Sequence, residues 1–194
     1  IYSRLDEPMA DSSLVPSFIL CQMARKEVIV GLGGDGADEL FAGYDPFKAL
    51  APARLYSNVV PGMLHGVMTR LADCIPVSHR NMSLDFKVKR FVSGLKFNSN
   101  IRNAVWLGPL PPCYLSMLFG KTLDPEMVYE EAINAWQAVE GGNEVDRTLQ
   151  FYMELYLQNN ILTKMDRAGM LNSLEVRSPF LDIEFVNLAL NNPE

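Results

Sequence analysis

The chain has 194 residues, of which 48% are hydrophobic, so it is long enough and apolar enough to fold around a core. Its 17 basic and 23 acidic side chains give a formal net charge of −6, which argues against nucleic acid or an anionic membrane as a bulk partner. No apolar run approaches the roughly 20 residues that cross a bilayer, so we expect no membrane partner.

The cysteines and histidines show no metal-binding pattern. The three cysteines lie tens of residues apart and form no CxxC, and His65 and His79 are not spaced as metal ligands. Reduced, mostly buried thiols are the simplest interpretation. We therefore expect a cytoplasmic location.

The first elements in chain order predict half of an α/β unit. Residues 11–27 carry serines able to cap a helix, a proline near its first turn and apolar residues at helical spacing. The β-branched run 28–32 follows and is bounded by glycine, which is typical of a strand buried on both faces of a parallel sheet. The acidic pair that begins at Asp38 favours a helix start, so the glycines before it predict a strand-to-helix loop.

The rest of the chain is mostly helical in pattern. Helical patches with prolines cover 46–71, a polar loop after Cys74 enters another helix, and the proline-rich segment 106–124 predicts a connecting loop. A long pattern over 145–165 predicts a helix that ends near Asp166 and Arg167, and 183–191 predicts one more. No repeat or linker divides the sequence, so we expect a single domain over 1–194.

The loop after the predicted strand combines glycines with carboxylates. Gly33, Gly34 and Gly36 would let a phosphate approach the backbone, at the sheet edge where parallel folds bind ligands. Carboxylates such as Asp35 and Asp38 repel phosphates, and a Mg²⁺ ion between them would remove that conflict. A tight turn with an acidic helix cap explains the same residues without a ligand. The loop is neither a P-loop nor a GxGxxG motif.

A second group of charges lies in segments 162–167 and 175–182. Basic residues near a helix end are favoured by the helix dipole without any ligand. An ion pair of Arg177 with Glu175 or Asp182 would also be purely structural. By themselves these residues indicate structure more than function.

Three segments taken together resemble a known family. In order, they are LDEPMADSSLVPSFIL, GLGGDGADELFAGYDPF and LTKMDRAGMLNSLEVRSPFLDIEF. They closely resemble the synthetase domain of glutamine-hydrolysing asparagine synthetases, the bacterial type in particular, from residue 5 to about 190, although 51–143 offers little to match. The resemblance implies an α/β fold of the adenine-nucleotide alpha-hydrolase type, a Rossmann-like ATP pyrophosphatase. This chain would be its predominantly α-helical part, with about one central parallel strand.

The resemblance also implies the chemistry. Members of this family use ATP and Mg²⁺ to adenylate the side-chain carboxylate of aspartate, with release of pyrophosphate. Ammonia, which a separate N-terminal glutaminase domain supplies from glutamine, then displaces AMP and gives asparagine. The substrates expected here are therefore ATP, aspartate or a similar carboxylate, and ammonia.

Site residues follow from the matching motif positions. Asp35 and Lys164 are the catalytic candidates, Asp35 because its position is thought to orient substrate or move protons during attack by ammonia. Asp38 is expected to hold Mg²⁺ against pyrophosphate. The nucleotide-binding candidates are Gly33, Gly34, Gly36 and Arg177.

Weaker candidates come from the same three motifs. Arg167 is expected on the phosphate side of the cleft, Asp182 to hold the last loop, and Glu39 to cap a helix or orient a neighbour. The candidates near the acceptor pocket are Asp6, Glu7, Asp11 and Ser12.

Some family features are not found in this sequence. The pyrophosphate-binding Ser-Gly-Gly-x-Asp-Ser loop and the glutaminase domain do not occur in it. We therefore expect a fragment that carries half an active site and does not complete the reaction alone. A strand without neighbours has unpaired edges, which favours a homodimer.

Two other interpretations stay open. The activation chemistry is shared by related amide-forming ligases, such as β-lactam synthetases and polysaccharide or peptide amidotransferases, which act on another carboxylate. A non-catalytic helical interaction module that retains the loop as a turn is the second.

Overall fold

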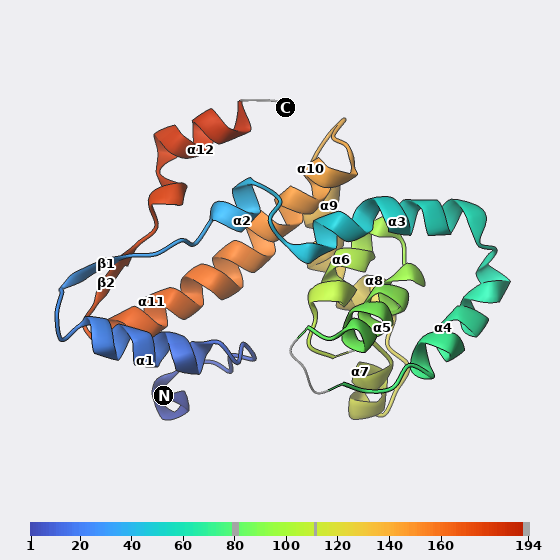
Figure 1. Ribbon diagram of the computed structural model, residues 1–194, viewed down its shortest axis with the longest axis horizontal. Helices are drawn as coiled ribbons and strands as arrows, with labels where there is room; N and C mark the ends of the chain where they lie inside the picture. The colour runs from blue at the N-terminus through green and yellow to red at the C-terminus, as the bar shows by residue number, and fades with distance from the viewer. Residues whose placement is uncertain (79–81, 111, 192–194) are drawn as a thin grey trace. The chain divides into compact units, whose positions relative to one another are not determined.

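The computed structural model describes residues 1–78, 82–110 and 112–191, so His79 lies outside the described residues. The chain folds as two units: unit 1 comprises Ile1–Gly43 and Tyr152–Glu194, and unit 2 comprises Tyr44–Phe151. Their elements are labelled in Figure 1. The single domain expected over 1–194 stays a prediction.

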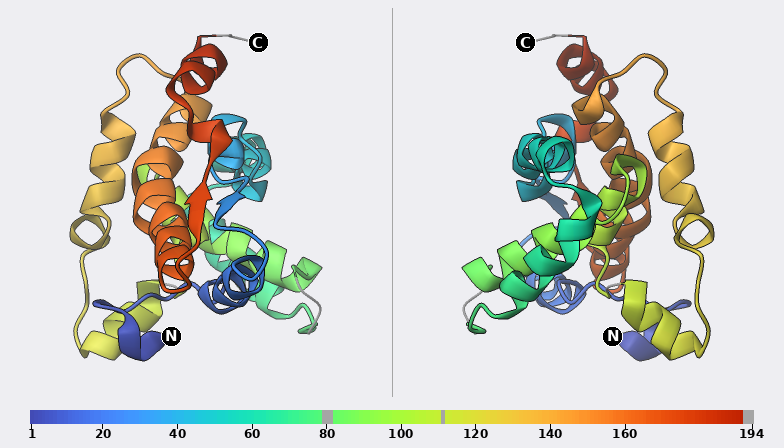
Figure 2. Two further views of the ribbon diagram at one scale, coloured as in Figure 1. Left: turned by 90° about the vertical axis from the view of Figure 1, so that its left-hand side faces the viewer. Right: turned by 90° about the vertical axis from the view of Figure 1, so that its right-hand side faces the viewer.

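Unit 1 contains two short parallel strands. β1 (Val30–Leu32) pairs with β2 (Glu175–Arg177), with Gly31 opposite Val176, and Figure 2 shows them side by side. Its helices are α1 (Leu14–Ala24), α2 (Ala37–Leu40), a π-helix (Tyr152–Leu162), α11 (Thr163–Met170) and α12 (Ile183–Leu190), with 3₁₀ turns at Tyr2–Arg4 and Pro179–Leu181.

The core of unit 1 forms where α1 packs against α11. Leu14 and Cys21 lie seven residues apart on one face of α1, and both are buried. Ala168 of α11 and Leu174, just before β2, are buried with them. Because Ala168 is small and fully buried, the two helices approach closely there, which fixes the start of α1 beside α11.

Unit 2 is entirely helical in its described residues. Its core contains Leu50, Ala53, Leu95 and Trp106, and the Trp106 ring stacks on Phe91 with centroids 5.9 Å apart. Its helices are α3 (Asp45–Val59), α4 (His65–Asp73), α5 (Leu84–Leu95), α6 (Ser99–Leu107), α7 (Pro112–Phe119), α8 (Pro125–Val128), α9 (Glu130–Gln137) and α10 (Glu144–Phe151), with a 3₁₀ turn at Gly62–Leu64.

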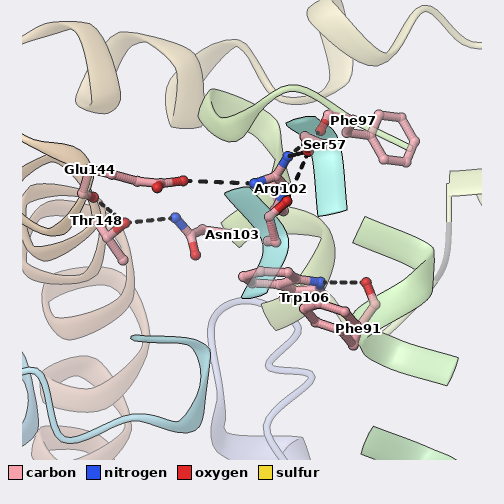
Figure 3. A network of polar contacts seen from close by, with 9 residues as sticks. Ser57, Phe91, Phe97, Arg102, Asn103, Trp106, Glu144 and Thr148 are labelled. Carbon is pink, nitrogen blue, oxygen red and sulfur yellow. Dashed lines mark hydrogen bonds and ion pairs between the residues drawn. The ribbon is translucent and has the colours of Figure 1, made fainter. Parts of the chain in front are cut away.

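A buried polar network joins α6 to α3 and α10 (Figure 3). Arg102 of α6 forms an ion pair with Glu144 of α10 at 3.7 Å, and it donates to the Ser57 hydroxyl of α3 at 3.3 Å. Asn103 donates to the Thr148 hydroxyl of α10 at 3.1 Å. Because buried polar groups lose stability when they are unpaired, these contacts favour one register of the three helices.

Several predicted elements are confirmed. The helix expected within 11–27 is α1, the strand within 28–32 is β1, the helix after the polar loop is α5, and the last helix is α12. The prediction of a connecting loop over 106–124 is wrong in part. α6 continues to Leu107, and α7 occupies Pro112–Phe119. Proline is tolerated in the first turn of a helix, so Pro112 begins α7 instead of preventing it.

The long helix near the C-terminal end is longer and less regular than predicted. It begins with α10 at Glu144, runs through the π-helix, and ends at Met170 rather than near Asp166. The apolar pattern of an α-helix repeats every 3.6 residues and does not reveal a π-helical stretch within it.

The strand predictions need two corrections. β1 is not buried on both faces, since Leu32 is 76% exposed and Val30 is 39% exposed; its β-branched residues reflect strand propensity rather than burial. The structure also has a second strand, β2, which was not predicted because Glu175 and Arg177 at its ends are charged. The expectation of mostly buried thiols is wrong for Cys74 and Cys113, which are exposed, and holds for Cys21.

No helix among the described residues is long and apolar enough to cross a membrane.

Candidate active site

Lys164 of α11 is a buried cation at the start of α1. Its Nζ lies 3.2 Å from Asp11 Oδ2 and donates to Ser13 Oγ at 2.9 Å. Asn160 of the π-helix donates to the same Asp11 oxygen at 3.2 Å. The first and third sequence motifs, about 150 residues apart in the chain, therefore meet at one ion pair.

Asp11 is held in place by the chain that follows it. Its Oδ1 accepts hydrogen bonds from the Ser13 N–H at 2.8 Å and from the Ser13 hydroxyl at 2.6 Å. Burial alone raises the pKa of Asp11, but the bonds from Ser13 and the Lys164 ammonium together hold it below its ordinary value. Asp11 therefore stays ionised beside Lys164.

Asp35, which belongs to the second motif, also lies under the influence of the Lys164 charge. It lies half-buried in the loop after β1. Burial raises the pKa of the Asp35 carboxyl, and the positive charge of Lys164 opposes that rise. The charge of Lys164 therefore acts on Asp35 as well as on Asp11, and the pairing of β1 with β2 places the second motif beside the third.

The loop glycines differ in what they contact. Gly33 continues the strand pairing, because its N–H donates to the Arg177 carbonyl at 2.8 Å. Gly36 has φ = +95° and lies against Leu181, which a Cβ atom at this position would overlap. Gly34 is exposed and has no atom within 4 Å of the position of a Cβ, so its backbone is open to a ligand.

Asp38 and Glu39 form the first turn of α2. Asp38 is exposed, and its carboxylate lies over Gly43, where a Cβ atom would overlap Oδ1. Glu39 is only 1% exposed. No group of three or more His, Cys, Asp or Glu side chains among the described residues is arranged to hold a metal. Asp38 is an exposed carboxylate of the kind that can ligate a divalent cation together with phosphate and water oxygens.

Two tyrosines of the π-helix lie beside these carboxylates. The Tyr152 and Tyr156 rings meet edge to face, with centroids 5.7 Å apart. Burial raises the pKa of Tyr156, and the negative charges of Asp11, Glu39 and Asp38 raise it further. Both phenols therefore stay protonated at neutral pH, and both lie on the π-helix, a feature frequent at functional sites.

Arg177 is not part of this cluster through its side chain. Its guanidinium donates to Glu175 Oε1 at 2.8 Å, and 65% of the side chain is exposed. Asp182, which was expected to hold the last loop, accepts hydrogen bonds from the N–H groups of Glu184 and Phe185 and so caps α12. Of the two ion pairs considered for Arg177, the structure forms the one with Glu175.

Arg167 forms a separate contact one helical turn from Lys164. Its Nη2 lies 2.9 Å from Asp6 and 2.7 Å from Glu7. Both carboxylates are largely exposed, so this contact contributes little to stability. It places the start of the first motif against α11, on the same helix as the buried pair.

Sequence reasoning missed four members of the cluster. Tyr152 and Tyr156 fall within the helix predicted over 145–165, and none of Tyr152, Tyr156, Ser13 and Asn160 was singled out as a site residue. Asn160 could have been predicted from the sequence. It precedes Lys164 by four residues, and residues at that spacing lie on the same face of a helix.

Comparisons with known proteins agree with these three motifs. The family model described as Asparagine synthase matches residues 1–194. The putative asparagine synthetase [glutamine-hydrolyzing] of Mycobacterium tuberculosis (strain ATCC 25618 / H37Rv) is 32% identical over 195 residues, which is 97% of this chain and 28% of that protein. Asparagine synthetase [glutamine-hydrolyzing] 1 of Bacillus subtilis (strain 168) is 26% identical over 199 residues, 98% of this chain and 29% of that protein. The chain thus spans little more than a quarter of these relatives, and no solved structure matches it significantly.

Proposed function

Because this chain belongs to the asparagine synthase family, we propose that it is part of a ligase that adenylates the side-chain carboxylate of aspartate and amidates it with ammonia from glutamine. The products are asparagine, AMP and pyrophosphate. The observation that carries the proposal is that the three motifs meet in unit 1, the first and third through the ion pair of Asp11 with Lys164 and the second and third through the pairing of β1 with β2. An interaction module would not need this arrangement of charges.

The two charged candidates have different tasks in this proposal. Lys164, held by its ion pair with Asp11, stabilises the negative charge that develops when the acceptor carboxylate attacks the α-phosphate and pyrophosphate leaves. Asp35, whose pKa burial raises, accepts a proton from the ammonia nitrogen as that nitrogen bonds to the acyl carbon and AMP leaves.

The loop after β1 supplies the nucleotide contacts. Gly34 offers an open backbone to the phosphates, whereas Gly33 and Gly36 shape the loop through Arg177 and Leu181. Asp38, exposed on the first turn of α2, holds Mg²⁺, which neutralises phosphate charge when it is bound. Nucleotide binding by Arg177 stays a proposal. It requires the Arg177 side chain to break its ion pair with Glu175.

The remaining family features belong to the same proposal. The two parallel strands and the helices around them are compatible with an α/β fold, and we assign them to the ATP pyrophosphatase type. The glutaminase domain is proposed on the same family basis. The cytoplasmic location is proposed from the cysteine pattern and the family, and homodimerisation from the strand edges that β1 and β2 leave unpaired among the described residues. An amide-forming ligase for another carboxylate is not favoured, since the relatives of Mycobacterium tuberculosis and Bacillus subtilis are named as asparagine synthetases.

Exchange of labelled pyrophosphate into ATP tests the proposal in the full-length protein. We expect exchange that requires aspartate and that falls at least tenfold in Lys164→Gln. In Asp35→Asn, exchange should persist while asparagine formation falls about 10²- to 10⁴-fold, because Asp35 acts only when ammonia attacks. Asp73→Asn, which changes an exposed carboxylate of α4, serves as the control. Exchange driven by another carboxylate but not by aspartate would contradict the assigned substrate.

A further inference from the structure

Unit 2 contains a cavity of about 1070 Å³ that the proposed reaction does not use. Residues of α3, α4, α5, α7 and α8 line it. Leu95, Phe97, Leu115 and Val128 supply apolar walls. Its volume is near the upper end of the range, about 300 to 1,000 Å³, of sites that bind small organic molecules.

The charged side chains that line this cavity are basic. Arg70, Lys96 and His65 line it, and no Asp or Glu of the described residues does. This bias runs against the composition of the chain, which has 23 acidic and 17 basic residues. Burial lowers the pKa of His65, and the charge of Lys96 lowers it further, so these two groups share one electrostatic environment.

A third cation lies behind the wall. Arg102 is 6% exposed and donates to the Ser57 hydroxyl and to the Phe97 carbonyl, and both of these residues line the cavity. Its Nε atom has no hydrogen-bond partner among the described residues, although Glu144 lies 3.7 Å from Nη1. Because Glu144 pairs with Arg102, the net positive charge of the lining comes from Arg70 and Lys96, while Arg102 holds Ser57 and Phe97 in place in the wall.

We propose that this cavity binds a small organic anion with an apolar body, whose acidic group Arg70 and Lys96 hold. The apolar walls accept the body, and a carboxylate, sulfonate or phosphate group satisfies cations that the lining leaves without an acidic partner. A neutral apolar molecule of the same size would fill the cavity without using these charges. The inference does not depend on the proposed ligase activity, because none of its residues belongs to the three motifs.

The free thiol of Cys113 provides a local reporter, because it lines the cavity and is exposed. The probe is 1-anilinonaphthalene-8-sulfonate, an aromatic anion, and its uncharged analogue N-phenyl-1-naphthylamine is the matched ligand. In the full chain we expect the sulfonate to slow alkylation of Cys113 by N-ethylmaleimide at least threefold. Cys74, also exposed but not part of the lining, should react at an unchanged rate, as peptide mass spectrometry can show.

Charge variants separate the proposal from simple hydrophobic binding. Lys96→Gln and Arg70→Gln should each weaken protection about three- to tenfold, whereas Lys48→Gln, an exposed lysine of α3 outside the lining, should not. Equal protection by the neutral analogue, or protection unchanged in both cavity variants, would overturn the proposal. So would the absence of protection in the unmodified chain.

Discussion

Asp11 and Lys164 bring distant parts of the sequence together at the scale of single residues. Each side chain is mostly buried, at 17% and 10% exposure, and each finds polar partners in addition to the other. A buried ion pair stabilises a fold only when the remaining hydrogen bonds are also formed, and Ser13 and Asn160 form them here. This pair is therefore a fixed part of the site, unlike the exposed pair of Arg177 with Glu175.

Asp11→Asn tests this pair through the pH dependence of stability. The pKa of Asp11 lies below its ordinary value of 3.8 in the folded chain, so its stabilising effect is complete above about pH 4 and is lost as the pH falls through the folded pKa. We expect Asp11→Asn to lower the free energy of unfolding by about 1 to 3 kcal/mol at pH 7. The difference from the unmodified chain should shrink below pH 4 in denaturant titrations. A difference independent of pH would show that charge is not the cause.

Two loop glycines give a matched pair of variants. Gly36→Ala should lower the free energy of unfolding by about 1 to 3 kcal/mol, because its φ is +95° and Leu181 occupies the place of the new methyl group. Gly34→Ala should change stability by less than about 0.5 kcal/mol, since its surroundings are open, yet it should weaken nucleotide binding. Unfolding curves and nucleotide titrations measure the two effects separately. Equal loss of stability in both variants would contradict the different roles assigned to these glycines.

The motif residues could be predicted from the sequence, but their partners could not. The order of glycines and carboxylates around Asp35 indicated a strand-to-helix loop, and β1 and α2 confirm it. The contact of Lys164 with Asp11 joins residues 153 positions apart, and no local pattern reveals such a pairing. Gly36 was interpreted as a nucleotide contact, whereas its contact with Leu181 gives it a structural reason to be glycine.

At the scale of elements, periodicity predicted helices better than it predicted their ends. α1, α5 and α12 were expected where they occur, because their apolar residues repeat at helical spacing. β2 was missed, since its three residues contain one apolar side chain and two charged ones, and only its pairing with β1 makes it a strand. α7 was not predicted because its segment is rich in proline, which suggested a loop. Proline can also be the first residue of a helix, as Pro112 is in α7.

The packing of α5 on α6 gives a prediction at this scale. Gly94 of α5 lies against the Trp106 indole, so Gly94→Ala should force the ring away and lower the free energy of unfolding by about 1 to 3 kcal/mol. Gly66→Ala, in α4 with no atom within 4 Å of the new Cβ, should raise it by up to about 1 kcal/mol because alanine favours helix. Thermal unfolding followed by circular dichroism measures both. A neutral Gly94→Ala would show that α5 and α6 are not closely packed.

At the scale of the whole molecule, the site and the cavity lie in different units. The three motifs meet in unit 1. The cation-lined cavity lies in unit 2, for which the sequence predicted no site. The chain is acidic overall, so the basic lining of the cavity is informative about its ligand. Family membership accounts for the first of these sites, and the second rests on the structure alone.

Calorimetric titration with ATP, in the presence and absence of Mg²⁺, is the most direct test of the central claim that the loop after β1 binds a nucleotide. We predict binding that depends on Mg²⁺ and weakens at least tenfold in Asp38→Asn, an isosteric change of an exposed side chain, while Asp73→Asn binds as the unmodified protein does. The titration is made on the full-length protein. Binding that is indifferent to Mg²⁺ and to Asp38→Asn, or no binding at all, would contradict the claim and leave the loop as a structural turn.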